Sequence, residues 1–230
     1  MLTLLHHPMS GPSRFIRLIL HEYQLTVELQ LENPWEKRTE FLLINPAQTL
    51  PVLSVNGNHH ICEAMIISEY LDETCGVFQR NLTLFPTDPI ERAETRRLLY
   101  WFLEKFDQEV AFPLINEIVL KRIMPVALGQ NSPESSVLRQ ARQNLKQHLK
   151  YLEWLAYNRH WLAGEFFSYV DLAAAAELST LDYIGEIDWD IYHIAKEWYT
   201  RVKSRPSFQT ILKDKIQGLA PVTHYTNLDF

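Results

Sequence analysis

The chain has 230 residues, of which 47% are hydrophobic and 22% are charged, so it has enough apolar surface to offset the entropy of ordering and is not a disordered chain. Its two cysteines exclude a scaffold held by several disulfides and indicate a reducing compartment. The net charge of −6 argues against nucleic-acid binding, which needs a basic surface to neutralise phosphates.

The N-terminal segment predicts a strand, a helix and a second strand. Residues 2–5 form a short apolar run, and Pro12 suits the first turn of a helix because its missing N–H would have no partner there. Apolar side chains recur at helical spacing from Phe15 to Tyr23, and residues 25–31 alternate between apolar and polar, as strands do. Strand–helix–strand units join parallel strands, so we expect these two strands to be parallel.

Residues 50–61 predict a β-hairpin. Two apolar runs flank Asn56-Gly57, a dipeptide that accepts the positive φ angles of a tight two-residue turn. A helix over residues 63–74 follows the hairpin. The whole order, with a short helix expected before the hairpin, is thioredoxin-like.

Long helical patterns dominate after a linker at residues 75–89. Periodicity indicates helices over 90–128 and 134–158, two more that begin near Val170 and Ile191, and a short one over 208–213. We therefore expect an α/β plus all-α chain, with a thioredoxin-like domain at 1–80 and an all-helical domain at 88–230. The tail from Gly218 is apolar for a chain end, so we expect it to dock on this protein or on another.

Membrane and metal sites are not expected. No apolar run approaches the roughly 20 residues that span a bilayer, and the N-terminus does not resemble a signal peptide, so we expect a cytoplasmic protein without membrane insertion. The histidine pairs at 6–7 and 59–60, with Cys62, match no zinc spacing, so we expect no metal.

Three positions in the N-terminal half allow both a structural and a functional interpretation. Ser10 precedes a helix, where serine commonly caps and where the helix dipole favours a bound thiolate or other anion; the sequence alone favours capping. Leu50-Pro51 opens a strand, and in a thioredoxin-like order we expect a cis bond that leaves the backbone of Leu50 free for an extended ligand. Glu63-Ala64 begins a helix whose free N–H groups suit the end of an amino-acid-like ligand.

Two further features carry side chains of interest. Trp35 lies in a charged turn, where it either packs over the core or is exposed to bind a partner protein. Packing over the core is the favoured interpretation. Ser168 and Asp171 have the spacing of a capping box, which we interpret as structural.

Motifs from nearly the whole chain together resemble the cytosolic glutathione transferases: His7-Pro8 with Ser10, Asn45-Pro46 leading to Leu50-Pro51, Glu63 at a helix start, Ser168 to Asp171, and Trp198-Tyr199 with Arg205-Pro206. The resemblance implies the fold described above. It also implies a homodimer.

The resemblance also implies roles for single residues. Ser10 takes the thiol-activating position, Leu50 and Pro51 the position that pairs with the glutathione backbone, and Glu63 and Ala64 the Glu-Ser pair that holds the γ-glutamyl end. Ala64 removes a hydroxyl donor, and the loss of a hydrogen bond to a charged group weakens binding by about tenfold or more. Gln48 stands where glycine is common. We therefore expect glutathione to bind weakly or not at all.

Within that superfamily, residues 6–8, 34–38, 148–151, 201–208 and 228–230 resemble a branch of bacterial division proteins that bind FtsZ filaments and promote their curvature without working as transferases. This implies FtsZ filaments as the partner, and we expect an exposed patch that includes Trp35, Asp229 and Phe230 to bind them.

Two alternatives stay open. An active transferase would use Ser10 and the helix dipole to lower the thiol pKa of glutathione, with a hydrophobic electrophile held between the domains against Tyr100, Trp101 and Lys105. A stress-type adaptor with this fold and another partner is the third interpretation.

Overall fold

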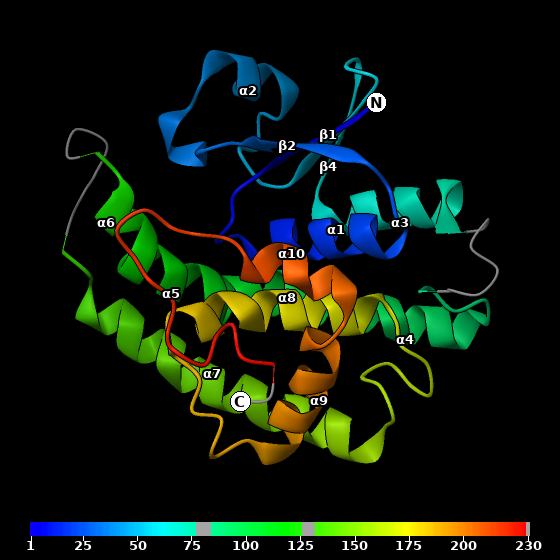
Figure 1. Ribbon diagram of the computed structural model, residues 1–230, viewed down its shortest axis with the longest axis vertical. Helices are drawn as coiled ribbons and strands as arrows, with labels where there is room; N and C mark the ends of the chain where they lie inside the picture. Colours follow the sequence, from blue (N-terminus) through cyan, green and yellow to red (C-terminus); the bar gives the residue numbers. More distant parts are fainter. Residues whose placement is uncertain (77–83, 126–131, 229–230) are drawn as a thin grey trace.

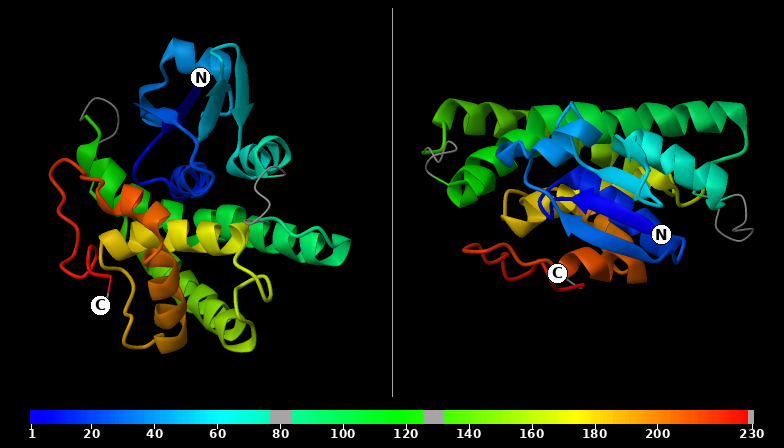
Figure 2. Two further views of the ribbon diagram at one scale, coloured as in Figure 1. Left: turned by 45° about the vertical axis from the view of Figure 1, so that its right-hand side comes forward. Right: turned by 90° about the horizontal axis from the view of Figure 1, so that it is seen from above.

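A computed structural model describes residues 1–76, 84–125 and 132–228 and places a small sheet layer beside a larger block of helices (Figures 1 and 2). The elements of the sheet-containing half are β1 (Leu2–His6), α1 (Gly11–Glu22), β2 (Val27–Leu31), η1 (Pro34–Glu36), α2 (Thr39–Ile44), β3 (Val52–Val55), β4 (His59–Cys62) and α3 (Ala64–Thr74). The four strands are ordered β2-β1-β3-β4, with β1 parallel to β2 and antiparallel to β3. The thioredoxin-like arrangement and the parallel pair are therefore confirmed.

The β3–β4 hairpin differs from the prediction by one residue. Val55 pairs with His59, so the loop holds Asn56, Gly57 and Asn58 rather than two residues. Asn56 and Gly57 have the positive φ values expected of them, 53° and 75°. Asn56 also bonds to Met1 through both its backbone N–H and its side chain, so this end of the loop is tied to the strand on the other side of β3.

The helical half contains α4 (Pro89–Tyr100), η3 (Trp101–Ala111), α5 (Phe112–Ile115), η4 (Asn116–Leu120), α6 (Lys121–Ile123), α7 (Ser135–Asn158), α8 (Tyr169–Tyr183), α9 (His193–Lys203), η6 (Pro206–Phe208) and α10 (Gln209–Leu212). The first five follow one another as a single helical rod. Helical geometry ends at Ile123, earlier than the predicted 128, because Met124 adopts an extended conformation with ψ of 141°. Residues 126–128 of that prediction lie outside the described residues.

The rod contains π-helical turns around a proline. η3 is π-helical, and Phe112 N–H bonds to Asp107 O, five residues back. Pro113 has no N–H, so it cannot bond to the carbonyl of Glu109 four residues earlier. Asn144 on α7 supplies that bond instead, because its side-chain Nδ2 donates to Glu109 O at 3.1 Å. A side chain from the neighbouring helix therefore satisfies the carbonyl that Pro113 leaves free.

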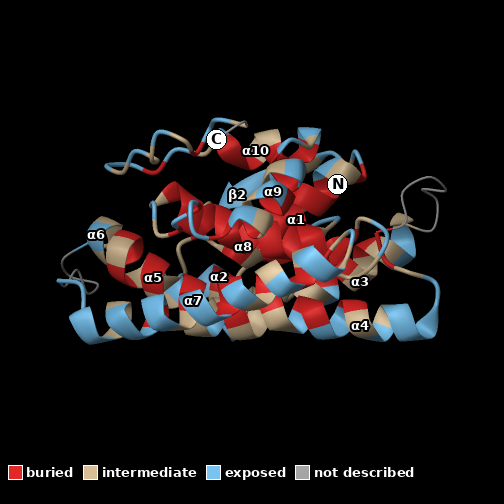
Figure 3. Ribbon diagram, turned by 90° about the horizontal axis from the view of Figure 1, so that it is seen from below, coloured by how far each residue is buried: buried red, intermediate tan, exposed pale blue. Residues whose placement is uncertain are grey.

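α8 is the centre of the core, since every one of its residues is buried. It packs against α1 and η3, and Figure 3 shows α1 and α8 as mostly buried ribbons. The capping box at its start is present: Asp171 accepts hydrogen bonds from the backbone N–H and hydroxyl of Ser168, and also from Leu162 N–H and the Trp198 indole. Four donors thus satisfy one fully buried carboxylate.

No helix in the described parts of the chain combines the length and hydropathy needed to cross a bilayer.

The Asn144–Glu109 bond makes a testable prediction. Replacing Asn144 with Ala should lower the free energy of unfolding by about 1 kcal/mol, because a partly buried carbonyl loses its donor. In a Pro113→Ala background the restored N–H bonds to that carbonyl, so the same Asn144→Ala change should cost less. Urea unfolding of the four proteins measures both effects, with Gln147→Ala on the exposed side of α7 as control. Equal costs in both backgrounds would contradict this account.

Candidate functional site

A cleft of about 410 Å³ lies between the sheet-containing half and the helical rod. The N-terminal side supplies polar groups to it, which are Ser10, Lys37, Gln48 and Thr49. The rod supplies a mainly apolar wall made of Ala111, Phe112, Ile115, Leu120 and Met124, with Asp107 at one end. The cleft is therefore amphipathic, with most of its polar groups on the N-terminal side and a mainly apolar surface on the rod.

The structure brings several of the predicted site residues to this cleft. Ser10, Trp35 and Leu50 all line it, and the Leu50-Pro51 peptide is cis, as predicted. Glu63 and Ala64 do not line the cavity, but the Thr49 hydroxyl donates to Glu63 Oε1 at 2.6 Å and so connects the start of α3 to the cleft. Ala64 is buried.

Other predicted positions lie elsewhere. Tyr100, Trp101 and Lys105 do not line the cleft; Trp101 instead packs on Tyr151 of α7, with ring centroids 4.6 Å apart. The expected electrophile wall was therefore misplaced along the rod, because Asp107, Ala111 and Ile115 face the cleft at a four-residue spacing. Asp229 and Phe230 lie outside the described residues.

Trp35 is half-buried at the cleft, so part of its side chain stays exposed. Its ring packs edge-on against His7, with centroids 5.5 Å apart, and His7 Nδ1 accepts a hydrogen bond from Met9 N–H at 3.2 Å. Burial lowers the pKa of His7 to about 4, and the positive charges of His6 and Arg14 act in the same direction. His7 is thus a neutral acceptor that supports both Trp35 and the loop leading to Ser10.

Ser10 caps α1, as the favoured interpretation held. Its Oγ accepts a hydrogen bond from Ser13 N–H at 3.2 Å, and its own N–H donates to His7 O. The hydroxyl proton of Ser10 still points to no partner within the described residues, so it can donate to a ligand in the cleft.

The backbone around the cleft is held in an uncommon conformation. Lys37, Gln48 and Glu63 have φ values of 50°, 61° and 70°, in the left-handed region where glycine is preferred. Gln48 thus keeps the backbone that glycine would adopt while placing a long side chain on the cleft wall. Each such residue costs about 1 kcal/mol, a feature that clusters at ligand sites.

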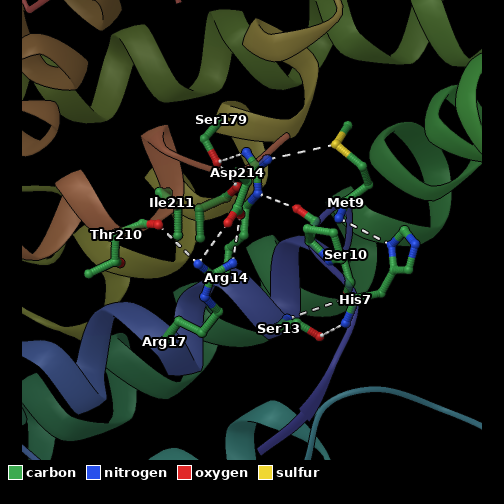
Figure 4. Close-up of polar contacts among 12 residues, drawn as sticks. His7, Met9, Ser10, Ser13, Arg14, Arg17, Ser179, Thr210, Ile211 and Asp214 are labelled. Atoms are coloured by element: carbon green, nitrogen blue, oxygen red, sulfur yellow. Dashed lines mark hydrogen bonds and ion pairs between the residues drawn. The ribbon is translucent and has the colours of Figure 1, made fainter. Parts of the chain in front are cut away.

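Arg14 on α1 connects this cleft to the C-terminal tail (Figure 4). Its guanidinium is fully buried and donates to Pro8 O at 2.6 Å, to Ser179 Oγ at 2.8 Å and to Tyr225 OH at 3.1 Å, with Met9 Sδ at 3.7 Å. Pro8 and Met9 belong to the loop that carries Ser10. The tail therefore docks on its own body as far as Leu228, and Tyr225 shares the guanidinium that positions the cleft loop.

A second arginine on α1 holds the start of the same tail. Arg17 forms a bidentate pair with Asp214, with both distances below 3 Å, and donates to Thr210 O (Figure 4). Further along, Tyr183 OH donates to Leu219 O, and a ring nitrogen of His224 lies 2.9 Å from Asp182. The tail is thus fastened at several points along its length.

Two acids flank the N-terminus of α1 beside Ser10. Asp107 faces the cleft from η3, and burial, together with the charge of Glu104, raises its pKa to about 7. Glu177 on α8 is fully buried, and a methyl group on Gly11 would overlap its carboxylate, so the two are in direct contact. Burial and the nearby Asp107 raise the pKa of Glu177 well above its usual range.

These acids oppose thiol activation. A thiolate needs positive potential, which a helix N-terminus supplies. Here the ionised form of Asp107 places negative charge at that terminus, and Gly11 brings the Glu177 carboxyl against its backbone. Like charges disfavour each other in a partly buried site, so an ionised Asp107 counteracts the stabilisation that the helix dipole gives to a thiolate in the cleft.

Sequence analysis did not find Asp107 or Glu177. Glu177 carried a usable signal, because it directly follows Ala173 to Ala176, a run of small apolar residues that is typical of a closely packed helix, where an acid is uncommon. Asp107 carried none, since polar residues on a long amphipathic helix are normally solvated.

No group of three or more His, Cys, Asp or Glu side chains in the described residues is placed to hold a metal ion.

Comparison with known proteins decides the family. Residues 10–74 match the model for the glutathione S-transferase N-terminal domain, and residues 95–206 match that for the C-terminal domain. The chain belongs to the glutathione S-transferase family. It is 45% identical to FtsZ-localized protein A of Caulobacter vibrioides over 233 residues, which cover 99% of this chain and 98% of that protein.

Solved structures agree with this family assignment. A glutathione S-transferase from Sinorhizobium meliloti superposes with a TM-score of 0.98 at 53% identity and covers all of both chains. FzlA from C. crescentus gives a TM-score of 0.90 at 43% identity, over 100% of this chain and 99% of that one. The resemblance to both the family and FzlA is therefore confirmed.

The buried neutral His7 predicts a pH dependence of stability. Its folded pKa of about 4 lies below its ordinary 6.5, so the unfolded chain takes up the proton first as the pH falls. Stability should therefore be complete above about pH 6.5 and decrease between about pH 6.5 and 4, by up to about 3 kcal/mol from this group. His7→Asn, whose side-chain oxygen can accept from Met9 N–H, should flatten this slope in urea unfolding. The same change at exposed His59 is the control, and an unchanged slope in His7→Asn contradicts the role given to His7.

Proposed function

We propose that this protein binds FtsZ filaments as a cytoplasmic homodimer and promotes their curvature during cell division, without working as a transferase. The observation that carries the proposal is the near-full-length similarity to FtsZ-localized protein A. The electrostatics of the cleft support the non-catalytic part, since Asp107 and Glu177 oppose a thiolate beside Ser10. Ala64 and Gln48 further weaken the case for glutathione.

The partner surface that we propose includes Trp35 and the end of the tail. Trp35 is one of the cleft-lining aromatic groups, and Leu228, which precedes Asp229 and Phe230 in the sequence, packs half-buried against the core. Aromatic anchors with nearby charges are typical of interface centres.

Co-sedimentation with polymerised FtsZ tests this proposal. The wild-type protein should pellet with GTP-assembled FtsZ. Trp35→Ala should weaken the affinity for the polymer by about tenfold and so lower the pelleted fraction, as expected for the loss of an aromatic anchor. Truncation after Leu228 should weaken pelleting while leaving the docked tail and the melting temperature unchanged. Phe166→Ala, at an aromatic ring that is 80% exposed, is the matched control. Failure of the wild-type protein to pellet would reject the proposal.

An active glutathione transferase is the second candidate, favoured by the cis Leu50-Pro51 peptide and the Ser10 hydroxyl at the cleft. Retention on immobilised glutathione and conjugation of an aromatic electrophile would establish it. Ser10→Ala should then abolish turnover, whereas the non-catalytic proposal expects no turnover in the wild-type protein.

The homodimer has a candidate surface along α3, α4 and α7. Ion pairing joins α3 to α4 through Glu69 and Arg96, and Arg97 donates to Tyr151 OH of α7. Three large apolar side chains on these helices, Ile66, Tyr100 and Trp154, are more than half exposed. Such a set on one side of a molecule is typical of a subunit interface.

Light scattering tests the dimer. The wild-type protein should have twice the mass of the chain, and Trp154→Glu should shift it toward the monomer because a charge is buried in an apolar contact. The same change at exposed Phe166 is the control. A monomeric wild-type protein at micromolar concentration rules out the dimer.

A further inference from the structure

The cleft contains acidic groups that have no cationic partner among the described residues. Asp107 lines the cavity, and none of the described groups bonds to its carboxylate. Glu177 is fully buried against Gly11, which lines the cleft, and neither of its carboxylate oxygens has a hydrogen-bond partner in the described residues. Asp107 is half-buried, whereas Glu177 is fully buried. Carboxyl groups that are withdrawn from water are normally bonded or paired, so two unpartnered ones at and beside one cavity point to a ligand that carries a donor.

The nearby cations do not supply that donor. Arg14 is the basic group that acts on Glu177, but its guanidinium is already shared among Pro8, Ser179 and Tyr225. Lys37 lines the cleft as an exposed residue at its outer side. The negative charge of Glu104 acts on both acids and raises the pKa of each.

The apolar surface that continues along the rod from Asp107 determines what accompanies the charge. Ala111, Ile115 and Leu120 are almost fully buried where they face the cavity, and Phe112 and Met124 extend the apolar surface. A ligand that binds both the Asp107 carboxylate and this apolar surface carries a cationic donor at one end and hydrocarbon at the other.

We infer that the cleft binds an alkylammonium or alkylguanidinium group, with the charge at Asp107 and the hydrocarbon along the apolar wall of the rod. The group belongs either to a free amphipathic amine or to a lysine or arginine side chain of a partner protein. The inference does not depend on FtsZ binding, because it rests on the cleft alone.

Calorimetric titration with 4-phenylbutylamine and its uncharged analogue 4-phenylbutan-1-ol tests the inference. The amine should bind at least about tenfold more tightly than the alcohol, as expected for a hydrogen-bonded charge pair. Asp107→Asn should remove this preference, whereas Asp190→Asn, the same change in an exposed loop, should keep it. Equal binding of amine and alcohol, or an unchanged preference in Asp107→Asn, overturns the inference.

A pH series on the wild-type protein provides a test without any substitution. The titratable and charged groups around Asp107 come from several elements. They are Glu104 on η3, Glu177 on α8, Arg14 on α1, the neutral His7 before α1, and Lys37. Glu63, at the start of α3, acts on Glu104 in turn. Since ionisation of Asp107 creates the attraction, the preference for the amine over the alcohol should increase from about pH 5.5 to about pH 8.5. A preference that stays constant or decreases contradicts the inference.

Competition distinguishes the two sources of the cationic group. Excess 4-phenylbutylamine should displace the protein from FtsZ polymer if the group is a partner side chain, and should leave pelleting unchanged if it belongs to a free amine. Because the titrations need no FtsZ, failure of the proposed function and failure of this inference give different results.

Discussion

The buried guanidinium of Arg14 is the interaction on which the site depends. A charge with no exposure to water is tolerated only when its donors are satisfied, and here the acceptors come from the cleft loop, from α8 and from the tail. Because one group serves all three, the loop that carries Ser10 cannot be placed independently of Tyr225. The tail is therefore part of the cleft's support rather than an appendage.

The same helix start shows why a transferase-like scaffold need not be a transferase. α1 retains its cap, its dipole and the serine hydroxyl, which are the parts that favour an anion. Asp107 and Glu177 counter them from η3 and α8, and Gly11 allows the closest approach because it has no side chain. When it is ionised, Asp107 places a negative charge in the same cleft as a helix N-terminus that favours an anion, with no change in the fold.

Local patterns predicted most of the architecture. The alternation in residues 25–31, the helical spacing after Pro12 and the Ser168–Asp171 cap each depend on neighbours in the chain, and each forms as expected. The hairpin loop is one residue longer than predicted, and its first residue, Asn56, bonds to Met1, a residue 55 positions away. The predicted contact of Tyr100, Trp101 and Lys105 with the cleft was wrong, because helical periodicity alone does not show which neighbour covers which face of the rod. Trp101 packs on α7, whereas Asp107 lines the cleft.

The sequence by itself determined the fold class and the order of the strands and helices, because these follow from short-range sterics, capping and hydrophobic spacing. The cis bond at Leu50-Pro51 was expected from the thioredoxin-like order, and several cleft residues from the resemblance to glutathione transferases. Only the tertiary structure decided the charge of the cleft and the place of the tail. Gly11, Asp107 and Glu177 are distant in the chain, as are Arg14 and Tyr225, and the field that one group exerts on another depends on their distance and burial after packing.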